Sequence, residues 1–179
     1  MAAPHACLTF ITDRLVLRPL VYADLDRVSE LFAVPTVARE LGLDARTLMA
    51  AKDRLRRCEA HWDRYGYGPS GLVERSTGVF VGLAGLVRNE ERDELGIEFS
   101  ITPDRRGRGY ATEALRAWIA WAASRRLADH LVTTVPEHHT AMPQTLERLG
   151  FVADPDPVLD GAAERGRVRW CLDLSLVGS

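Results

Sequence analysis

The segment that most constrains this chain is a glycine- and arginine-rich turn that joins a predicted strand to a predicted helix. The turn covers residues 102–111, and its second part, 105–111, reads RRGRGYA. Apolar residues alternate over 95–101 before the turn and recur at helical spacing over 112–126 after it. A strand that passes through a short turn into a helix is typical of an α/β layer fold, in which helices pack on a sheet.

Hydrophobic spacing predicts the remaining elements. We expect a strand at 15–18 and a short helix near 23–33, which Pro35 ends, and then an irregular connector over 36–43. The strongest periodic segment is a long helix that begins at Leu48 and is ended by Gly66. The other expected elements are strands at 72–75, 79–87, 131–135, 151–153 and 168–174 and a short helix at 143–149.

The same spacing assigns side chains to the core or the surface. Trp62 and Tyr65 continue the apolar stripe of the long helix, so we interpret them as core residues rather than as binding residues. Three arginines alternate in a late strand, which favours a solvated face over a clamp for an acidic substrate. These arginines are Arg165, Arg167 and Arg169.

Length and composition predict a single domain over residues 1–179. The chain is 46% hydrophobic and 27% charged, values close to the globular average. Its formal net charge of −2 argues against nucleic acid or a membrane surface as a partner. The longest apolar run, 78–87, has half the length of a membrane span, which needs about 20 residues. The three cysteines form no C-x-x-C pair and no signal-peptide pattern is visible, so we expect a cytoplasmic protein.

The glycine- and arginine-rich turn has the features of an anion site. The first N–H groups of a helix have no partner within the helix, and glycines let an anion approach the backbone closely. Arg105, Arg106 and Arg108 add full positive charges. A phosphate or pyrophosphate is the natural ligand of such a turn. A solvated basic turn without a ligand is the alternative, and the turn by itself does not decide between the two.

Two common phosphate-binding motifs do not fit this turn. A Walker loop ends in Gly-Lys-Ser/Thr, but Lys52 is the only lysine of the chain, which excludes a P-loop NTPase. A dinucleotide-binding fingerprint requires G-x-G-x-x-G, and Thr112 stands where the third glycine is needed.

A third pattern fits better: residues 106–111, RGRGYA, match R/Q-x-x-G-x-G/A. This pattern resembles the coenzyme A pyrophosphate loop of the GNAT N-acetyltransferase superfamily. Other segments resemble its ribosomal-protein N-acetyltransferase-like (Rim-type) branch in the same order, so that the likeness extends over essentially the whole chain. These segments are TDRLVLRPL at 12–20, GYG at 66–68, TG at 77–78, VG at 81–82, GYATEA at 109–114 and LERLGF at 146–151.

The resemblance implies an α/β GNAT fold and acetyl-coenzyme A as co-substrate. Its sheet is mixed and mostly antiparallel, with a splayed parallel strand pair at the coenzyme cleft and helices on both faces. Pantetheine is then expected to pair with Phe99, Ser100 and Ile101, and a backbone N–H there, assigned to Ile101, polarises the thioester carbonyl. The expected coenzyme-binding residues of the turn are Arg106, Gly107, Arg108, Gly109, Tyr110, Ala111 and Thr112.

Transfer to an amine also requires a base, because an amine is mostly protonated at neutral pH. Glu98 is the candidate, since it lies in the strand beside the expected cleft, on the face opposite Ile97 and Phe99. An exposed strand glutamate on a solvated face is the alternative.

The chain departs from the family after its fifth predicted strand, where Asn-x-x-Ser is usual. His139 takes the Asn place and is expected to bind pantetheine, and Met142, which has no proton to donate, takes the Ser place. His138, His139, Thr140 or water then protonates the thiolate. Adjacent histidines point apart and are poor metal ligands, so no metal is expected.

The resemblance places the acceptor near residues 35–42, and we select Arg39, Glu40 and Tyr67 as its contacts. The predicted function is transfer of acetyl to a protein or peptide α-amine or a small amine. Alternatives are another acyl donor such as succinyl-coenzyme A, or a non-catalytic acyl-coenzyme A-binding module. The expected oligomeric state is a monomer or homodimer.

Overall fold

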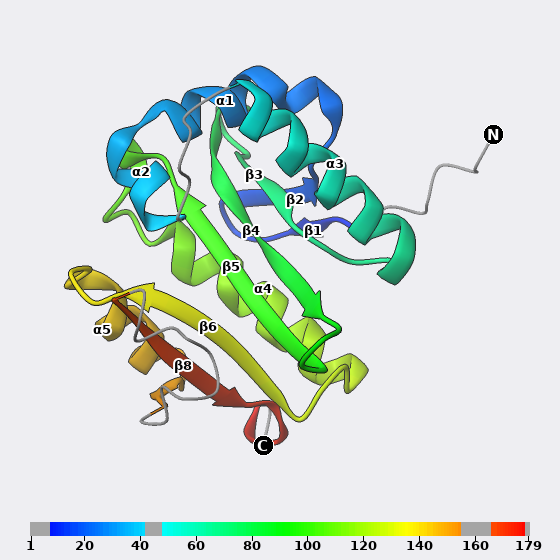
Figure 1. The fold of residues 1–179 in the computed structure, drawn as a ribbon, viewed down its shortest axis with the longest axis vertical. Coiled ribbons are helices and arrows are strands. Elements are labelled where there is room, and N and C mark those ends of the chain that lie inside the picture. The colour runs from blue at the N-terminus through cyan, green and yellow to red at the C-terminus, as the bar shows by residue number, and fades with distance from the viewer. Residues whose placement is uncertain (1–7, 42–47, 155–165, 178–179) are drawn as a thin grey trace. The chain divides into compact units, whose positions relative to one another are not determined.

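A computed structural model describes residues 8–41, 48–154 and 166–177, which form one mixed sheet with helices (Figure 1). The strand order is β1-β2-β3-β4-β5-β6-β8-β7. The strands are β1 Phe10–Ile11, β2 Leu15–Pro19, β3 Ser70–Glu74, β4 Phe80–Asn89, β5 Glu94–Ile101, β6 His130–Pro136, β7 Val152–Ala153 and β8 Arg167–Asp173. The α-helices are α1 Leu25–Ala33, α2 Pro35–Glu40, α3 Leu48–Tyr65, α4 Tyr110–Arg125 and α5 Ala141–Arg148, and the 3-10 turns are η1 Tyr22–Asp24, η2 Pro103–Arg105 and η5 Leu174–Leu176.

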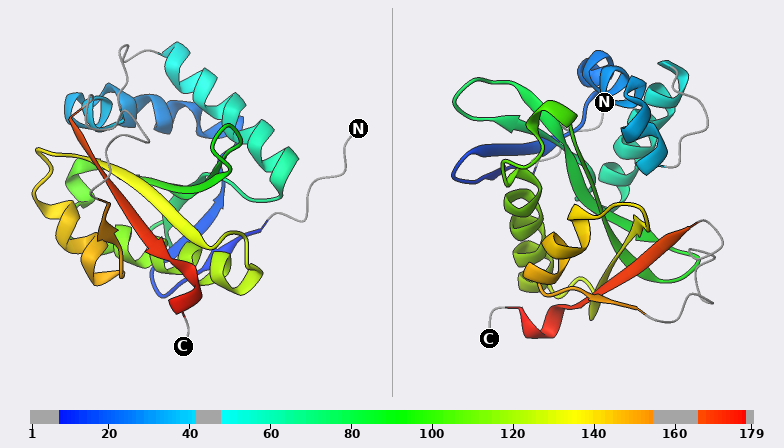
Figure 2. Two further views of the ribbon diagram at one scale, coloured as in Figure 1. Left: turned by 60° about the horizontal axis from the view of Figure 1, so that its bottom comes forward. Right: turned by 90° about the vertical axis from the view of Figure 1, so that its left-hand side faces the viewer.

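The strand pairings confirm the predicted fold class. β5 and β6 pair in parallel, with Leu95 opposite Leu131 and Gly96 opposite Val132. The pairs β1·β2, β2·β3, β3·β4, β6·β8 and β7·β8 are antiparallel. Helix α3 and the first turns of α4 cover opposite faces of strands β2–β4 (Figure 2).

Contacts divide the chain into two compact units. The first comprises residues 1–87 and 98–115, and the second comprises 88–97 and 116–179. Each unit combines distant parts of the sequence. The single domain expected over 1–179 stays a prediction.

The core of the first unit forms where α1, α2 and α3 pack on β4. Val28 and Phe32 of α1 meet Leu55 and Cys58 of α3, and Leu83 of β4 closes the cluster. Apolar residues spaced three and four positions apart along α3 produce this buried stripe, as the sequence predicts. Trp62 is buried and donates its indole N–H to the Pro69 carbonyl (2.8 Å), whereas Tyr65 is only half-buried.

The expected connector after Pro35 is wrong over its first part, because residues 35–40 form helix α2. Pro35 ends α1 but also occupies the first turn of α2, where its missing N–H costs nothing and its fixed φ suits a helix. Val37 and Ala38 bury one side of α2. The rest of the expected connector, from residue 42 onward, lies outside the described residues.

A bulge in β4 fixes the start of the glycine- and arginine-rich turn. Val81 is the extra residue of the bulge, and its carbonyl accepts the N–H of Thr102 (3.0 Å). Gly82 has φ +151°, and a Cβ built on it would lie 2.2 Å from the carbonyl oxygen of Ser100. β4 can therefore approach the end of β5 this closely only with glycine at position 82.

Gly82→Ala is accordingly expected to destabilise the protein strongly, because the added carbon meets backbone atoms that cannot rotate away. We expect a loss of about 3 kcal/mol, equivalent to a fall in Tm of about 10 °C, measured by thermal and urea unfolding. The control is Gly66→Ala, because Gly66 also has a positive φ but no atom lies within 4 Å of the place that its Cβ would take. Equal destabilisation by the two variants would contradict this account of the bulge.

In the second unit, the expectation of a solvated arginine face on the last strand is wrong for Arg169. Its side chain is buried and lies between Glu94 (2.8 Å) and Asp154 (3.0 Å). Arg167 is half-buried and donates to the Thr134 carbonyl (2.9 Å). Two acidic partners satisfy the buried guanidinium, which strand alternation alone does not reveal. Arg165 lies outside the described residues.

Candidate active site

The candidate site is built on the connection from β5 to α4. The turn begins with η2, in which the N–H of Arg105 donates to the Thr102 carbonyl (2.9 Å). Gly107 (φ +74°) and Gly109 (φ +80°) then take the left-handed conformation, and α4 starts at Tyr110. Two left-handed glycines on alternate positions reverse the chain sharply before the helix.

The N–H groups of residues 107–112 find no hydrogen-bond acceptor among the described residues. The helical ladder begins only at Glu113, whose N–H donates to the Gly109 carbonyl (3.1 Å). Gly107 and Gly109 are exposed, so their backbone is accessible to a ligand. Because α4 has 16 residues, its first turn also carries the positive end of a substantial helix dipole. This is the arrangement that binds phosphate groups in many proteins.

The three arginines of the turn have different roles. Arg106 is fully engaged: it pairs with Glu40 and donates Nε to the Ile101 carbonyl (3.1 Å). Arg105 lies near the carboxylates of Asp104 (3.1 Å) and Glu74 (3.6 Å). Arg108 is exposed, and its guanidinium forms no hydrogen bond or ion pair with the described part of the chain. The expected cluster of three available charges is therefore reduced to Arg108, because acidic side chains neutralise the other two.

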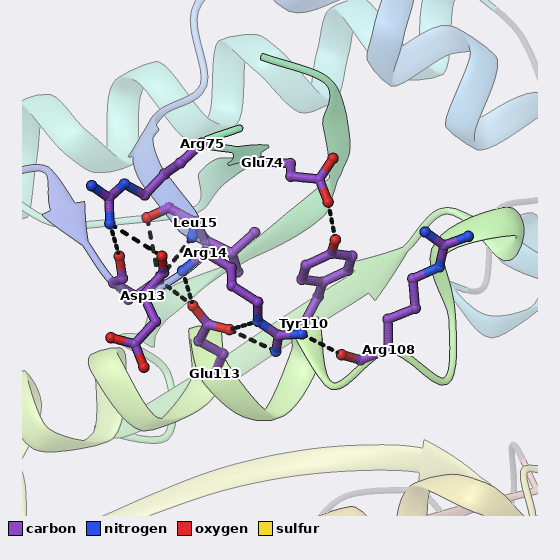
Figure 3. A network of polar contacts seen from close by, with 9 residues as sticks. Asp13, Arg14, Leu15, Glu74, Arg75, Arg108, Tyr110 and Glu113 are labelled. Atoms are coloured by element: carbon purple, nitrogen blue, oxygen red, sulfur yellow. Dashed lines mark hydrogen bonds and ion pairs between the residues drawn. The ribbon is translucent and has the colours of Figure 1, made fainter. Parts of the chain in front are cut away.

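A half-buried carboxylate anchors the first turn of α4 to the β1–β2 connection (Figure 3). Glu113 accepts hydrogen bonds from the Thr12 hydroxyl (2.6 Å) and from the backbone N–H and Nε of Arg14 (2.8 and 2.7 Å). Arg14 also donates to the Arg108 carbonyl (2.7 Å), and its guanidinium lies 4.9 Å from the centre of the Tyr110 ring. This network holds both the turn and the helix that follows it.

Tyr110 adds a second anchor at the first residue of α4. Its ring is buried, and its hydroxyl donates to Glu74 at the end of β3. The hydrogen bond to Glu74 raises the pKa of the Tyr110 hydroxyl. Hydrogen bonds from Thr77 and Tyr110 lower the pKa of the Glu74 carboxyl. The side chain of Tyr110 is thus used for structure, while its backbone N–H belongs to the candidate site.

The Glu113 anchor predicts a pH-dependent contribution to stability. Burial acts to raise the pKa of Glu113, but the hydrogen bonds from Thr12 and Arg14 outweigh it and lower the pKa below the ordinary 4.5. The unfolded chain therefore binds this proton more readily, so the contribution is present above about pH 5 and is lost as the pH falls through the acid range. Glu113→Gln should cost about 2 kcal/mol at pH 7.

Urea unfolding at pH 7 and near pH 3 measures this effect. The difference between Glu113→Gln and the natural chain should shrink at the lower pH, because protonation of Glu113 removes the charge that only the natural chain carries. A difference that stays constant between the two pH values would contradict the role of the ionised carboxylate.

Glu98, the expected base, is half-buried and forms an ion pair with Arg54 of α3. Arg54 lies one turn before Cys58 and two turns before His61 on the same helix. Burial lowers the pKa of His61, whose Nδ1 lies 2.8 Å from the Tyr67 carbonyl oxygen. The interpretation of Glu98 as a glutamate on a solvated face does not match this environment.

Sequence reasoning missed Arg54 and His61, because it followed only the apolar positions of α3. The signal is present: Arg54 lies four residues before the buried Cys58 and His61 three residues after it, so both fall at helical spacing next to the apolar stripe. A charged residue beside such a stripe requires a partner, and Glu98 supplies it.

The remaining predicted site residues occupy varied environments. Ser100 and Ile101 are buried and Phe99 is half-buried at the end of β5. Arg39 is exposed on α2, and Tyr67 is buried, with its ring 5.5 Å from that of His61. In the second unit, Nδ1 of His139 accepts the N–H of Met142 (3.3 Å), so this side chain satisfies one of the first N–H groups of α5.

Comparison with known proteins decides the family. The model of the acetyltransferase (GNAT) domain matches residues 14–152, more than half of the chain. The chain belongs to the GNAT acetyltransferase family. Acyl transfer from acetyl-coenzyme A is the reaction of this family, so the chain is identified as an acetyltransferase.

Solved structures share the GNAT fold over nearly the full chain. An acetyltransferase from Agrobacterium tumefaciens has a TM-score of 0.80 at 24% identity, covering 96% of this chain and 97% of that one. A ribosomal-protein-S5-alanine acetyltransferase from Vibrio fischeri has a TM-score of 0.72 at 12% identity (94% and 97% covered). A microcin C7 self-immunity acetyltransferase in complex with acetyl-coenzyme A and AMP has a TM-score of 0.70 at 10% identity (90% and 93% covered).

Two further observations concern this GNAT protein. Among the described residues, no group of three or more His, Cys, Asp or Glu side chains is placed to hold a metal ion. No helix in residues 8–41, 48–154 or 166–177 is long and apolar enough to cross a membrane.

Proposed function

We propose that this chain is an N-acetyltransferase that moves the acetyl group of acetyl-coenzyme A directly to a primary amine in a ternary complex. The acceptor is an α-amine of a protein or peptide, or a small-molecule amine. The observation that carries the proposal is the run of N–H groups at 107–112, which has no acceptor in the described chain and lies at the start of α4. A family that uses acetyl-coenzyme A needs a diphosphate site, and this run has the chemistry for one.

Each part of the coenzyme has candidate partners in the chain. The backbone of residues 107–112 is suited to the diphosphate, and Arg108 adds a full charge beside it. The end of β5, at Phe99, Ser100 and Ile101, offers backbone groups for the pantetheine arm. An N–H there, assigned to Ile101, polarises the thioester carbonyl. His139 is the pantetheine candidate of the second unit.

The reaction forms one C–N bond and breaks one C–S bond. The neutral amine nitrogen attacks the thioester carbonyl carbon, and the coenzyme thiolate leaves with the electron pair of the C–S bond. Glu98 accepts the amine proton, directly or through water. His138, His139, Thr140 or water then protonates the thiolate, because Met142 at the usual Ser place has no proton to donate.

The three cysteines without a C-x-x-C pair fit a reducing compartment, so we assign the reaction to the cytoplasm. A monomer or homodimer without nucleic acid or membrane partner completes the proposal.

A free-thiol release assay tests the proposal. Acetyl-coenzyme A is supplied with peptides of varied N-terminal residue, polyamines and aminoglycosides, and mass spectrometry identifies the acetylated amine. Thiol release that depends on one class of amine supports the proposal. Turnover only with succinyl-coenzyme A would reassign the donor, and binding of acetyl-coenzyme A without release for any amine would favour a non-catalytic module.

A further inference from the structure

The ion pair between Glu40 and Arg106 joins two segments that the sequence assigns to different ligands. The sequence predicts Glu40 at the acceptor and Arg106 at the coenzyme. In the structure their side chains form a two-point contact, with NH1 and NH2 of Arg106 at 2.8 and 2.7 Å from the two carboxylate oxygens. The Glu40 side chain is 18% exposed, so the pair is partly shielded from water.

The contact uses the whole guanidinium of Arg106. Its third nitrogen, Nε, donates to the Ile101 carbonyl at the end of β5 (3.1 Å). The side chain therefore ties the turn to β5 and to α2 at once. A guanidinium whose three nitrogens all donate hydrogen bonds has little conformational freedom, and Glu40 already balances its charge.

The position of Glu40 also points to a role outside its own helix. Glu40 is the last residue of α2, where a negative charge faces the negative end of the helix dipole. A glutamate at this position does not stabilise α2, but its carboxylate matches the geometry of the Arg106 guanidinium. Only the backbone of residues 107–112 and the Arg108 side chain then remain available to a diphosphate.

We propose that Glu40 is a positioning residue for the diphosphate half of acetyl-coenzyme A, and that it acts through Arg106 rather than on the acceptor amine. Holding Arg106 keeps the turn in the conformation that presents the N–H groups of 107–112. The inference rests on the proposed function, because it assigns the diphosphate to this turn. It predicts that the effect of Glu40 depends on the diphosphate being present in the donor.

The test compares two donors that share the acetyl thioester but differ in the diphosphate. Glu40→Gln should lower kcat/KM for acetyl-coenzyme A about tenfold, through KM, and leave the value for S-acetylpantetheine unchanged. Arg106→Gln should act in the same way, and the double variant should be no worse than the more affected single variant. The control is Glu30→Gln, which removes the same charge from an exposed position on α1. Unfolding curves verify that each variant is folded.

Binding by calorimetry keeps the inference testable without turnover. Glu40→Gln should weaken coenzyme A binding about tenfold and leave pantetheine binding unchanged. Two results for coenzyme A would overturn the inference. Tighter binding would mean that Glu40 competes with the diphosphate for Arg106, and unchanged binding would mean that Glu40 has no role in diphosphate binding. An equal loss with both donors would overturn it as well, and would place Glu40 at the acceptor or in general stability. If the natural chain binds coenzyme A but acetylates no amine, the proposed function is refuted, whereas the inference about Glu40 and the diphosphate is not.

Discussion

Gly107→Val should reduce kcat/KM for acetyl-coenzyme A by a factor on the order of 100. Gly107 has φ +74°, a conformation that a β-branched residue adopts only with strain. The turn would relieve this strain by rotating its backbone, which redirects N–H groups that we assign to the diphosphate. The strain and the lost hydrogen bonds together amount to about 3 kcal/mol, which corresponds to that factor. Steady-state kinetics with varied acetyl-coenzyme A measures the change.

The matched control is Gly66→Val at the end of α3. Gly66 has nearly the same φ, +71°, and neither glycine has an atom within 4 Å of where a Cβ would be. Both substitutions should lower the unfolding temperature to a similar degree, but only Gly107→Val should raise KM for acetyl-coenzyme A. If both variants affect KM equally, the turn has no special role in coenzyme binding.

Glu98→Gln should lower kcat by a factor of about 100 and leave the affinity for coenzyme A unchanged. The amide keeps the shape of the side chain but cannot accept the amine proton, and general-base catalysis typically contributes a factor of this order. The ion pair with Arg54 holds the carboxylate in one orientation. Arg54→Met should therefore lower kcat as well, and combining it with Glu98→Gln should add little.

Glu94→Gln is the control on the same strand. Glu94 pairs with Arg169, so its substitution should lower stability without a specific loss of kcat. Unchanged turnover of Glu98→Gln at every pH tested would remove Glu98 from the mechanism. Water or another group would then have to accept the amine proton.

The elements of the fold are predictable from the sequence where one face of a segment is buried. The stripe of α3 extends from Ala51 to Trp62 at regular spacing, so its helix and its end at Gly66 follow directly. Helix α2 is not predicted, because Pro35 is interpreted only as the end of α1. Proline is equally suited to the first turn of a helix, and Pro35 occupies that place in α2. The two-residue strand β1 is too short to carry a periodic signal.

The site is predictable only as far as it is local. The glycine turn and the helix that follows it are contained within a few residues, so the sequence predicts them. In the structure Gly107 and Gly109 have a positive φ and α4 begins directly afterwards, at Tyr110. The partners of the charged side chains are not local. Glu40 meets Arg106 across 66 residues, and Glu113 meets Arg14 across 99 residues. Which arginine remains available to a ligand depends on these distant carboxylates, and no spacing rule contains that information.

The most direct measurement of the central claim observes the backbone N–H groups themselves. Amide ¹H–¹⁵N spectra are recorded while acetyl-coenzyme A is added to the labelled protein, and then while S-acetylpantetheine is added. We expect the amide signals of residues 107–112 to shift strongly with acetyl-coenzyme A and to change little with the donor that lacks the diphosphate. Binding of acetyl-coenzyme A that leaves these signals in place, or shifts them equally with both donors, would contradict the claim that this turn is the diphosphate site.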